Sequence, residues 1–115
     1  MAKVKISVIK KMNTKDIFGS KPPVKINKEM LTPECQCFQE GQEFIIDSEK
    51  FAPDPETWQT CPPNFCSWAY GDIQRDIASI LFGGSYPWIE DKGTIISCCT
   101  DGLRPVVFKI ERIEN

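Results

Sequence analysis

Six cysteines are the residues of this chain best suited to carry chemistry. They lie in three clusters along the sequence: Cys35 and Cys37, Cys61 and Cys66, and Cys98 and Cys99. Each cluster falls near a predicted end of a helix or strand, and a small fold can bring such ends together. Thiolates bind zinc and iron–sulfur clusters, and they also act as nucleophiles and redox groups. The clusters therefore predict a cysteine-based site.

Metal binding is the first chemistry that the clusters suggest. Four sulfurs suit tetrahedral zinc, and four-cysteine sets also hold iron–sulfur clusters. The spacings Cys-x-Cys and Cys-x4-Cys differ from the Cys-x2-Cys of zinc knuckles, so they permit a metal without identifying it. Cys98 and Cys99 are adjacent in a predicted strand and point to opposite faces, so only one of them joins a given site easily.

A catalytic thiol is the second interpretation. Cys66 is predicted to lie in the first turn of a helix, where the helix dipole lowers the pKa of a thiol. Cys61 is then its resolving partner in a redox reaction, and Asp76 the acid–base group of a thiol enzyme. The third interpretation treats the cysteines as small apolar core residues of a protein-interaction module without chemistry.

Composition narrows the class of protein. The 115 residues predict a single domain with net charge −2, and the absence of histidine excludes imidazole-based catalysis and metal ligation. No signal-peptide-like or membrane-spanning apolar run is present, which predicts a cytoplasmic protein without membrane contact. In a reducing cytosol, stable disulfides are rare.

The lysine-rich first quarter lacks arginine and aromatic readers, so the expected partner is a protein or small molecule, not nucleic acid. Self-association is left open.

The patterning predicts an α+β fold with a small, mostly antiparallel sheet of about four strands and one main helix packed on it. The helix is expected to begin after an Asn64 cap and to end before Gly83-Gly84. A single helical turn is expected after Thr14, and residues 19–34 are expected to form a surface extension. The predicted strands are 3–10, 42–47, 94–99 and 106–113, and the predicted helix is 65–81.

Two further features of the sequence concern the core. The apolar residues of the predicted helix form one broad stripe, and Asp76 falls inside it, where a carboxylate is costly to bury unless it is hydrogen-bonded. The three tryptophans, Trp58, Trp68 and Trp88, are expected to close the core.

Four motifs resemble a family of small cysteine-containing bacterial and archaeal proteins of about this length and of unknown function. They are C-x5-GQ-x-F at 35–44, PNFC-x-WA at 63–69, FGG with a following PW at 82–88, and CCTDGLRPVVF at 98–108. The resemblance covers nearly the whole chain except 19–34. Many members carry a histidine shortly after the first cysteine, where this chain has none.

The resemblance implies that Cys35, Cys66 and Cys98, one from each cluster, belong to the site. Combined with the sulfur count, it predicts zinc or iron–sulfur binding through these three residues and a fourth group, Cys61 or Cys37. The missing histidine makes an imidazole-dependent mechanism unexpected and leaves the remaining cysteines as substitutes or bystanders.

Overall fold

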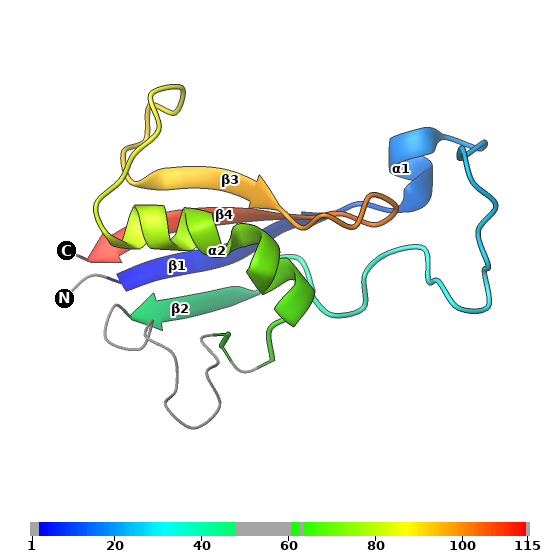
Figure 1. The fold of residues 1–115 in the computed structure, drawn as a ribbon, viewed down its shortest axis with the longest axis horizontal. Coiled ribbons are helices and arrows are strands. Elements are labelled where there is room, and N and C mark those ends of the chain that lie inside the picture. The colour runs from blue at the N-terminus through cyan, green and yellow to red at the C-terminus, as the bar shows by residue number, and fades with distance from the viewer. Residues whose placement is uncertain (1–2, 48–60, 63, 115) are drawn as a thin grey trace.

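Four strands form one antiparallel sheet, and the main helix lies across one face of it (Figure 1). The computed structural model describes residues 3–47, 61–62 and 64–114. Its elements are β1 (Lys3–Lys11), α1 (Thr14–Phe18), β2 (Glu43–Asp47), α2 (Ser67–Leu81), β3 (Thr94–Cys98) and β4 (Val106–Glu114). The strand order is β2-β1-β4-β3. The predicted α+β fold is therefore confirmed, including the hairpin of β3 and β4.

The core lies between α2 and the covered face of the sheet. Alternate residues of β1 point into it, and α2 contributes residues spaced three or four apart, as the strand and helix periodicities require. The fully buried side chains include Val4, Ile6, Val8, Ile73, Ile77, Ile80, Val106, Phe108 and Ile110. No helix in the described part of the chain is long and apolar enough to span a membrane.

The opposite face of the sheet is charged along its centre. Lys5 lies 3.5 Å from both Glu43 and Glu111, and Lys109 lies 3.6 Å from Glu111. Helix α2 covers only the other face (Figure 1). Exposed ion pairs of this kind add little stability, so this face is a solvated surface and the core forms on the other side.

Helix α2 begins two residues later than predicted. Asn64 adopts a left-handed backbone with a φ of 64°, and the Phe65 N–H donates to the Pro62 carbonyl at 3.3 Å. The chain thus turns before the helix, and Cys66 becomes its N-cap with an extended backbone instead of a residue of the first turn. Asparagine tolerates the left-handed region better than most residues, which explains why the turn occurs at Asn64.

The segment between β1 and β2 leaves the sheet before it returns. Figure 1 shows α1 and the following chain extending beyond the end of the strands. Asn13 and Asp16 close a capping box at the start of α1: the Asp16 N–H donates to Asn13 Oδ1 at 2.8 Å and the Asn13 N–H to Asp16 Oδ2 at 3.0 Å. The helix ends at Gly19, and residues 20–34 form the predicted surface extension without a regular helix.

The tryptophans do not close the core as expected. Trp68 is 68% exposed and Trp88 is 73% exposed, while Trp58 lies outside the described residues. The core space is filled instead by phenylalanines, among which Phe38 and Phe108 are almost fully buried. The expectation fails for Trp68 and Trp88 because their helix and loop positions face solvent.

Replacement of Asn64 tests the turn that sets the start of α2. We expect Asn64→Val to lower the free energy of unfolding by about 1–2 kcal/mol, because a β-branched residue is strained at positive φ. Asn64→Gly should stay within about 0.5 kcal/mol of the parent, since glycine accepts this backbone. Urea denaturation followed by tryptophan fluorescence measures both, and equal losses in the two variants would contradict this account.

Candidate cysteine site

The first cysteine cluster is folded into a tight turn at the end of the surface extension. The Cys37 N–H donates to the Cys35 sulfur at 3.4 Å. The next residue, Phe38, is 2% exposed, and its carbonyl accepts a 2.8 Å hydrogen bond from Lys11 Nζ at the end of β1. Lys11 also pairs with Glu34 at 3.7 Å. The turn is thus held to the sheet on both sides of its two thiols.

The second cluster precedes α2 and is held by Phe65. The ring of Phe65 packs edge-on against Phe38 with centroids 4.9 Å apart, and it is buried in the core. Cys66 follows directly as the N-cap of α2, while the Cys61 thiol lies 3.7 Å from the Phe65 carbonyl oxygen as its donor. Aromatic packing therefore brings two cysteine clusters together that are far apart in sequence.

The third cluster divides between the two faces of the sheet. The Ser97 hydroxyl donates to Asp76 on α2, so Ser97 faces the helix and exposed Cys98 points the other way. Cys99 follows β3, is buried, and accepts a 3.3 Å hydrogen bond at its sulfur from the Val106 N–H. Cys99, and not the Cys98 that the family resemblance implied, lies with the other clusters.

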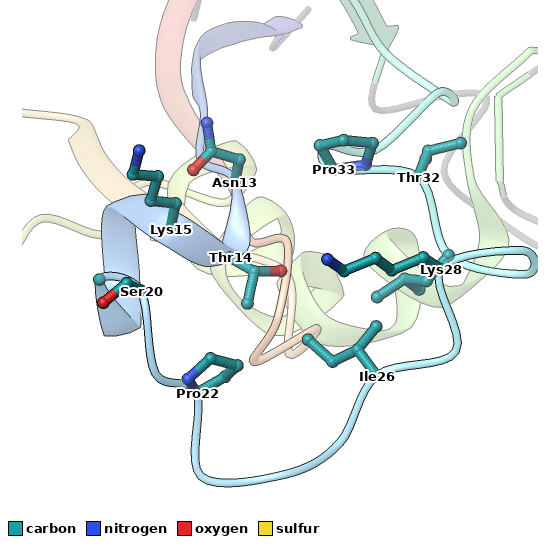
Figure 2. Close-up of a pocket in the computed structure, with 11 residues that line it drawn as sticks. Asn13, Thr14, Lys15, Ser20, Pro22, Ile26, Lys28, Thr32 and Pro33 are labelled. Atoms are coloured by element: carbon teal, nitrogen blue, oxygen red, sulfur yellow. The ribbon is translucent and has the colours of Figure 1, made fainter.

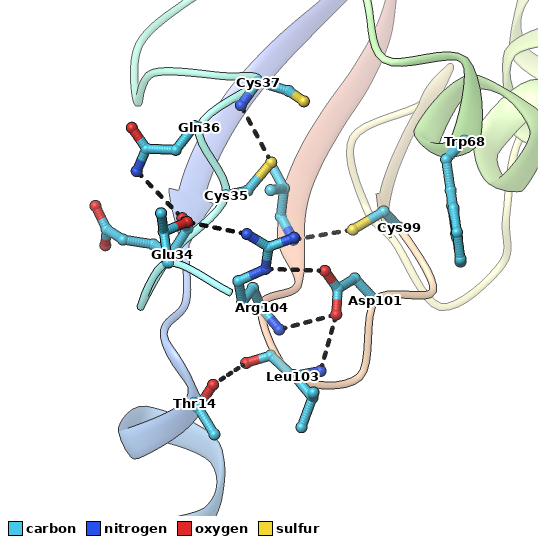
Figure 3. A network of polar contacts seen from close by, with 12 residues as sticks. Thr14, Glu34, Cys35, Gln36, Cys37, Trp68, Cys99, Asp101, Leu103 and Arg104 are labelled. Carbon is cyan, nitrogen blue, oxygen red and sulfur yellow. Dashed lines mark hydrogen bonds and ion pairs between the residues drawn. The ribbon is translucent and has the colours of Figure 1, made fainter. Parts of the chain in front are cut away.

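Four cysteines line one cleft of about 520 Å³. In Figure 3 the Arg104 side chain lies between Cys35 and Cys99, with Cys37 above Cys35 and Trp68 beyond Cys99. The apolar part of the cleft wall includes Leu31, Phe38, Ala69, Leu103 and Val106. The four lining cysteines are Cys35, Cys37, Cys66 and Cys99. Each of the three clusters thus contributes to the cleft, but Cys99 takes the place of the predicted Cys98, and Cys61 is not among the lining residues.

The thiols are close enough to influence one another electrostatically. Burial, and then the neighbouring thiols of Cys35 and Cys66, together raise the pKa of Cys37 to about 11, although the side chain keeps contact with solvent. Burial, and then the neighbouring Cys66, raises the pKa of Cys61. These shifts keep both thiols protonated at neutral pH.

Cys99 has a different balance of causes. Burial raises its pKa most, and the nearby Asp101 carboxylate and Cys35 add to the increase, whereas hydrogen bonds from the backbone of Val106 and Asp101 oppose it. The result is again a raised pKa. Hydrogen bonds from two backbone N–H groups to the Cys99 sulfur nevertheless stabilise its thiolate form.

Polar residues that the sequence did not single out for this site frame one side of the cleft. The Thr100 N–H donates to Asp72 Oδ2 at 2.7 Å, and the Trp68 indole N–H donates to Thr100 Oγ1 at 2.9 Å. These bonds tie the end of β3 to the first turns of α2. The only sequence signal for Asp72 is its position at the edge of the apolar stripe.

The loop after Cys99 is braced from within. Asp101 accepts hydrogen bonds from the backbone N–H groups of Leu103 and Arg104 and from Arg104 Nε at 3.2 Å. Arg104 Nη1 then donates to Thr32 Oγ1 at 3.0 Å, which joins this loop to the surface extension. Asp101 and Arg104 thus serve as internal supports of the cleft wall.

Asp76 does not share the cysteine cleft. It lies ten residues beyond Cys66, which is about 15 Å along the helix axis. Its carboxylate accepts hydrogen bonds from the hydroxyls of Tyr86 at 3.1 Å and Ser97 at 2.8 Å. The half-buried carboxylate in the apolar stripe is therefore satisfied by two hydroxyls, and it is not placed to exchange a proton with Cys66.

The thiols do not stand in the arrangement of a formed ion site. Among the described residues, no three side chains of Cys, His, Asp or Glu are grouped as a metal centre. The donors that line the cleft are nonetheless the soft sulfur ligands that zinc and iron–sulfur clusters use.

Comparison with known proteins adds no further constraint: no family model, curated protein or solved structure matches this chain.

The raised pKa of Cys37 predicts an unusual alkylation profile in the metal-free protein. Because the thiolate is the reacting form, the iodoacetamide rate at Cys37 should rise about tenfold per pH unit up to about pH 10. A thiol with the ordinary pKa near 8.5 would level off by about pH 9.5. Peptide mass spectrometry resolves the residues, and a plateau for Cys37 at or below about pH 9.5 would contradict the assignment.

Proposed function

We propose that this protein binds a thiophilic metal centre, zinc or an iron–sulfur cluster, in the cysteine cleft. Cys35, Cys37 and Cys66 supply three thiolates, and Cys99 or Cys61 supplies the fourth. The observation that carries the proposal is that Cys35, Cys37, Cys66 and Cys99, which come from three separate segments, line one cleft. Cys99 belongs to the core and Cys35 and Cys66 pack against it, but Cys37 is exposed, so core packing does not explain its position beside them.

Electrostatics supports a cation at this place. In the metal-free protein each thiolate would disfavour the next, and this repulsion contributes to the raised pKa of Cys37. A divalent ion reverses the balance, because it favours the deprotonated sulfur and deprotonates coordinating thiols outright.

Two of the sulfurs already have backbone support. The Cys37 N–H donates to Cys35 and the Val106 N–H donates to Cys99, at 3.4 and 3.3 Å. Hydrogen bonds to ligating sulfurs orient them and tune the metal, as outer-shell groups do in metal sites generally. This support favours Cys99 over Cys61 as the fourth ligand.

The thiol-enzyme alternative has less support. Its proposed acid–base residue, Asp76, is hydrogen-bonded elsewhere, about 15 Å from Cys66 along the helix. The neighbouring Cys61, the proposed resolving thiol, has a raised pKa and is a poor nucleophile at neutral pH. No group at the cleft is placed as a general base for Cys66 among the described hydrogen bonds.

Cobalt titration of the reduced protein tests the ligand set. We expect thiolate-to-cobalt charge-transfer absorption at one equivalent, with zinc displacing the cobalt. Cys37→Ser and Cys66→Ser should each weaken binding by about 100-fold or more, since they remove direct ligands. Cys98→Ser is the matched control, because Cys98 lies on the other face of the sheet, and it should leave binding unchanged.

The same titration identifies the fourth ligand. Only one of Cys99→Ser and Cys61→Ser should weaken cobalt binding as much as Cys37→Ser does. Iron and sulfide analysis of protein purified without oxygen distinguishes a cluster from zinc. The proposal is wrong if the parent protein gives no charge-transfer band, or if Cys98→Ser weakens binding as much as Cys37→Ser.

Metal affinity should rise steeply with pH. Each ligating thiol must lose its proton, so every released proton makes the apparent affinity about tenfold higher per pH unit. The pKa of Cys37, raised to about 11, keeps its contribution present over the whole range from about pH 6 to 9. Apparent dissociation constants and proton release into a weakly buffered indicator measure the effect. An affinity independent of pH would exclude thiolate ligation.

A further inference from the structure

A second cavity, which shares Leu31 with the cysteine cleft, lies between α1 and the surface extension (Figure 2). Its volume is about 590 Å³, which is in the range of small-molecule sites. Prolines and aliphatic residues, among them Pro22, Ile26 and Leu31, form part of the wall. Asn13, Thr14, Ser20 and Thr32 add polar side chains to it.

The two walls of the cavity are fixed to the same loop. On the α1 side, the Thr14 hydroxyl donates to the Leu103 carbonyl at 2.9 Å. On the side of the extension, Arg104 Nη1 donates to Thr32 Oγ1 at 3.0 Å. Leu103 and Arg104 are adjacent, and Asp101 holds their backbone N–H groups. The cavity is thus a supported feature of the fold.

The lining of the cavity has positive charge and no acidic side chain. Lys15 and Lys28 both line it, and neither forms an ion pair with any described residue. Figure 2 shows the Lys28 ammonium directed into the space beside Thr14. The acid on α1, Asp16, already accepts the Asn13 N–H in the capping box.

The surrounding segment carries the same sign of charge. Residues 10–33 contain six lysines and two acidic residues, whereas the whole chain has net charge −2. A concave surface lined by one sign of charge concentrates oppositely charged ligands. The positive charge therefore coincides with a cavity, which distinguishes it from lysines spread over a convex surface.

We propose that this cavity binds a small organic oxyanion, a molecule with a phosphate or carboxylate group attached to an apolar body. Lys28 pairs with the oxyanion, and Lys15 on the α1 wall adds positive charge nearby. The apolar body packs against Pro22, Ile26 and Leu31. This site is independent of the thiolate centre, and it needs no metal.

Nuclear magnetic resonance titration of the full chain tests the site with three probes: phenyl phosphate, benzoate and inorganic phosphate. We expect saturable shifts confined to amides of residues 13–15, 20 and 26–32, with phenyl phosphate binding more tightly than inorganic phosphate. Tighter binding of phenyl phosphate than of benzoate would identify a phosphate ligand. Tighter binding of benzoate would identify a carboxylate ligand.

Two lysine variants make the test specific. Lys28→Gln should weaken binding of the better probe by about tenfold or more, because a charge-assisted hydrogen bond is lost. Lys25→Gln removes the same charge from the same segment but outside the cavity lining, so its affinity should stay within about twofold. Lys28→Arg should retain most of the binding.

Three results would overturn the proposal. The first is the absence of saturable shifts with all three probes, and the second is an equal loss of affinity in Lys28→Gln and Lys25→Gln. The third is binding only to a long polyanion such as heparin, with shifts spread over all the lysines, which would show a general electrostatic surface instead of a cavity site. Unfolding curves of each variant verify that the fold is intact.

Discussion

The contact between the rings of Phe38 and Phe65 is the interaction on which the cysteine cleft depends. Their centroids lie 4.9 Å apart, and Phe108 of β4 lies 5.2 Å from Phe38. Phe38 directly follows the Cys35–Cys37 turn, and Phe65 directly precedes Cys66. Edge-to-face aromatic pairs of this kind contribute beyond their buried area. The same packing that stabilises the core therefore sets the distance between two sets of thiols.

The two ends of α2 contact different parts of the structure. At its beginning, Cys66 caps the helix at the cleft, and Asp72 is bonded to Thr100 at the end of β3. Towards its end, Asp76 is held by Tyr86 and Ser97, and Arg112 of β4 donates to the Ile80 carbonyl at 2.7 Å. A cation at the helix C-terminus and satisfied carbonyls stabilise that end. The helix therefore borders the cysteine cleft only at its start, through Cys66, Trp68 and Ala69.

Local patterns were sufficient to predict the elements but not the composition of the site. Alternation in the strands and the period of the helix identified β1, β2, β3, β4 and α2 within a few residues, because burial on one face imposes those periods. The start of α2 was missed because a left-handed Asn64 leaves no apolar signature. Strand alternation separated Cys98 from Cys99, yet only the bond from Ser97 to α2 reveals which of them faces inward. The Phe38–Phe65 contact joins distant segments, and no local pattern contains it.

The hydrogen bonds from the backbone to the sulfurs do not depend on which side chains the donor residues carry. The donors to Cys35 and Cys99 are main-chain N–H groups of Cys37 and Val106, and every residue except proline carries such a group. Exchange of the Val106 side chain therefore leaves its donor in place, provided that the local backbone is kept. The hydrogen bond to Cys99 therefore does not depend on which side chain stands at position 106; that side chain is constrained instead by its complete burial in the core.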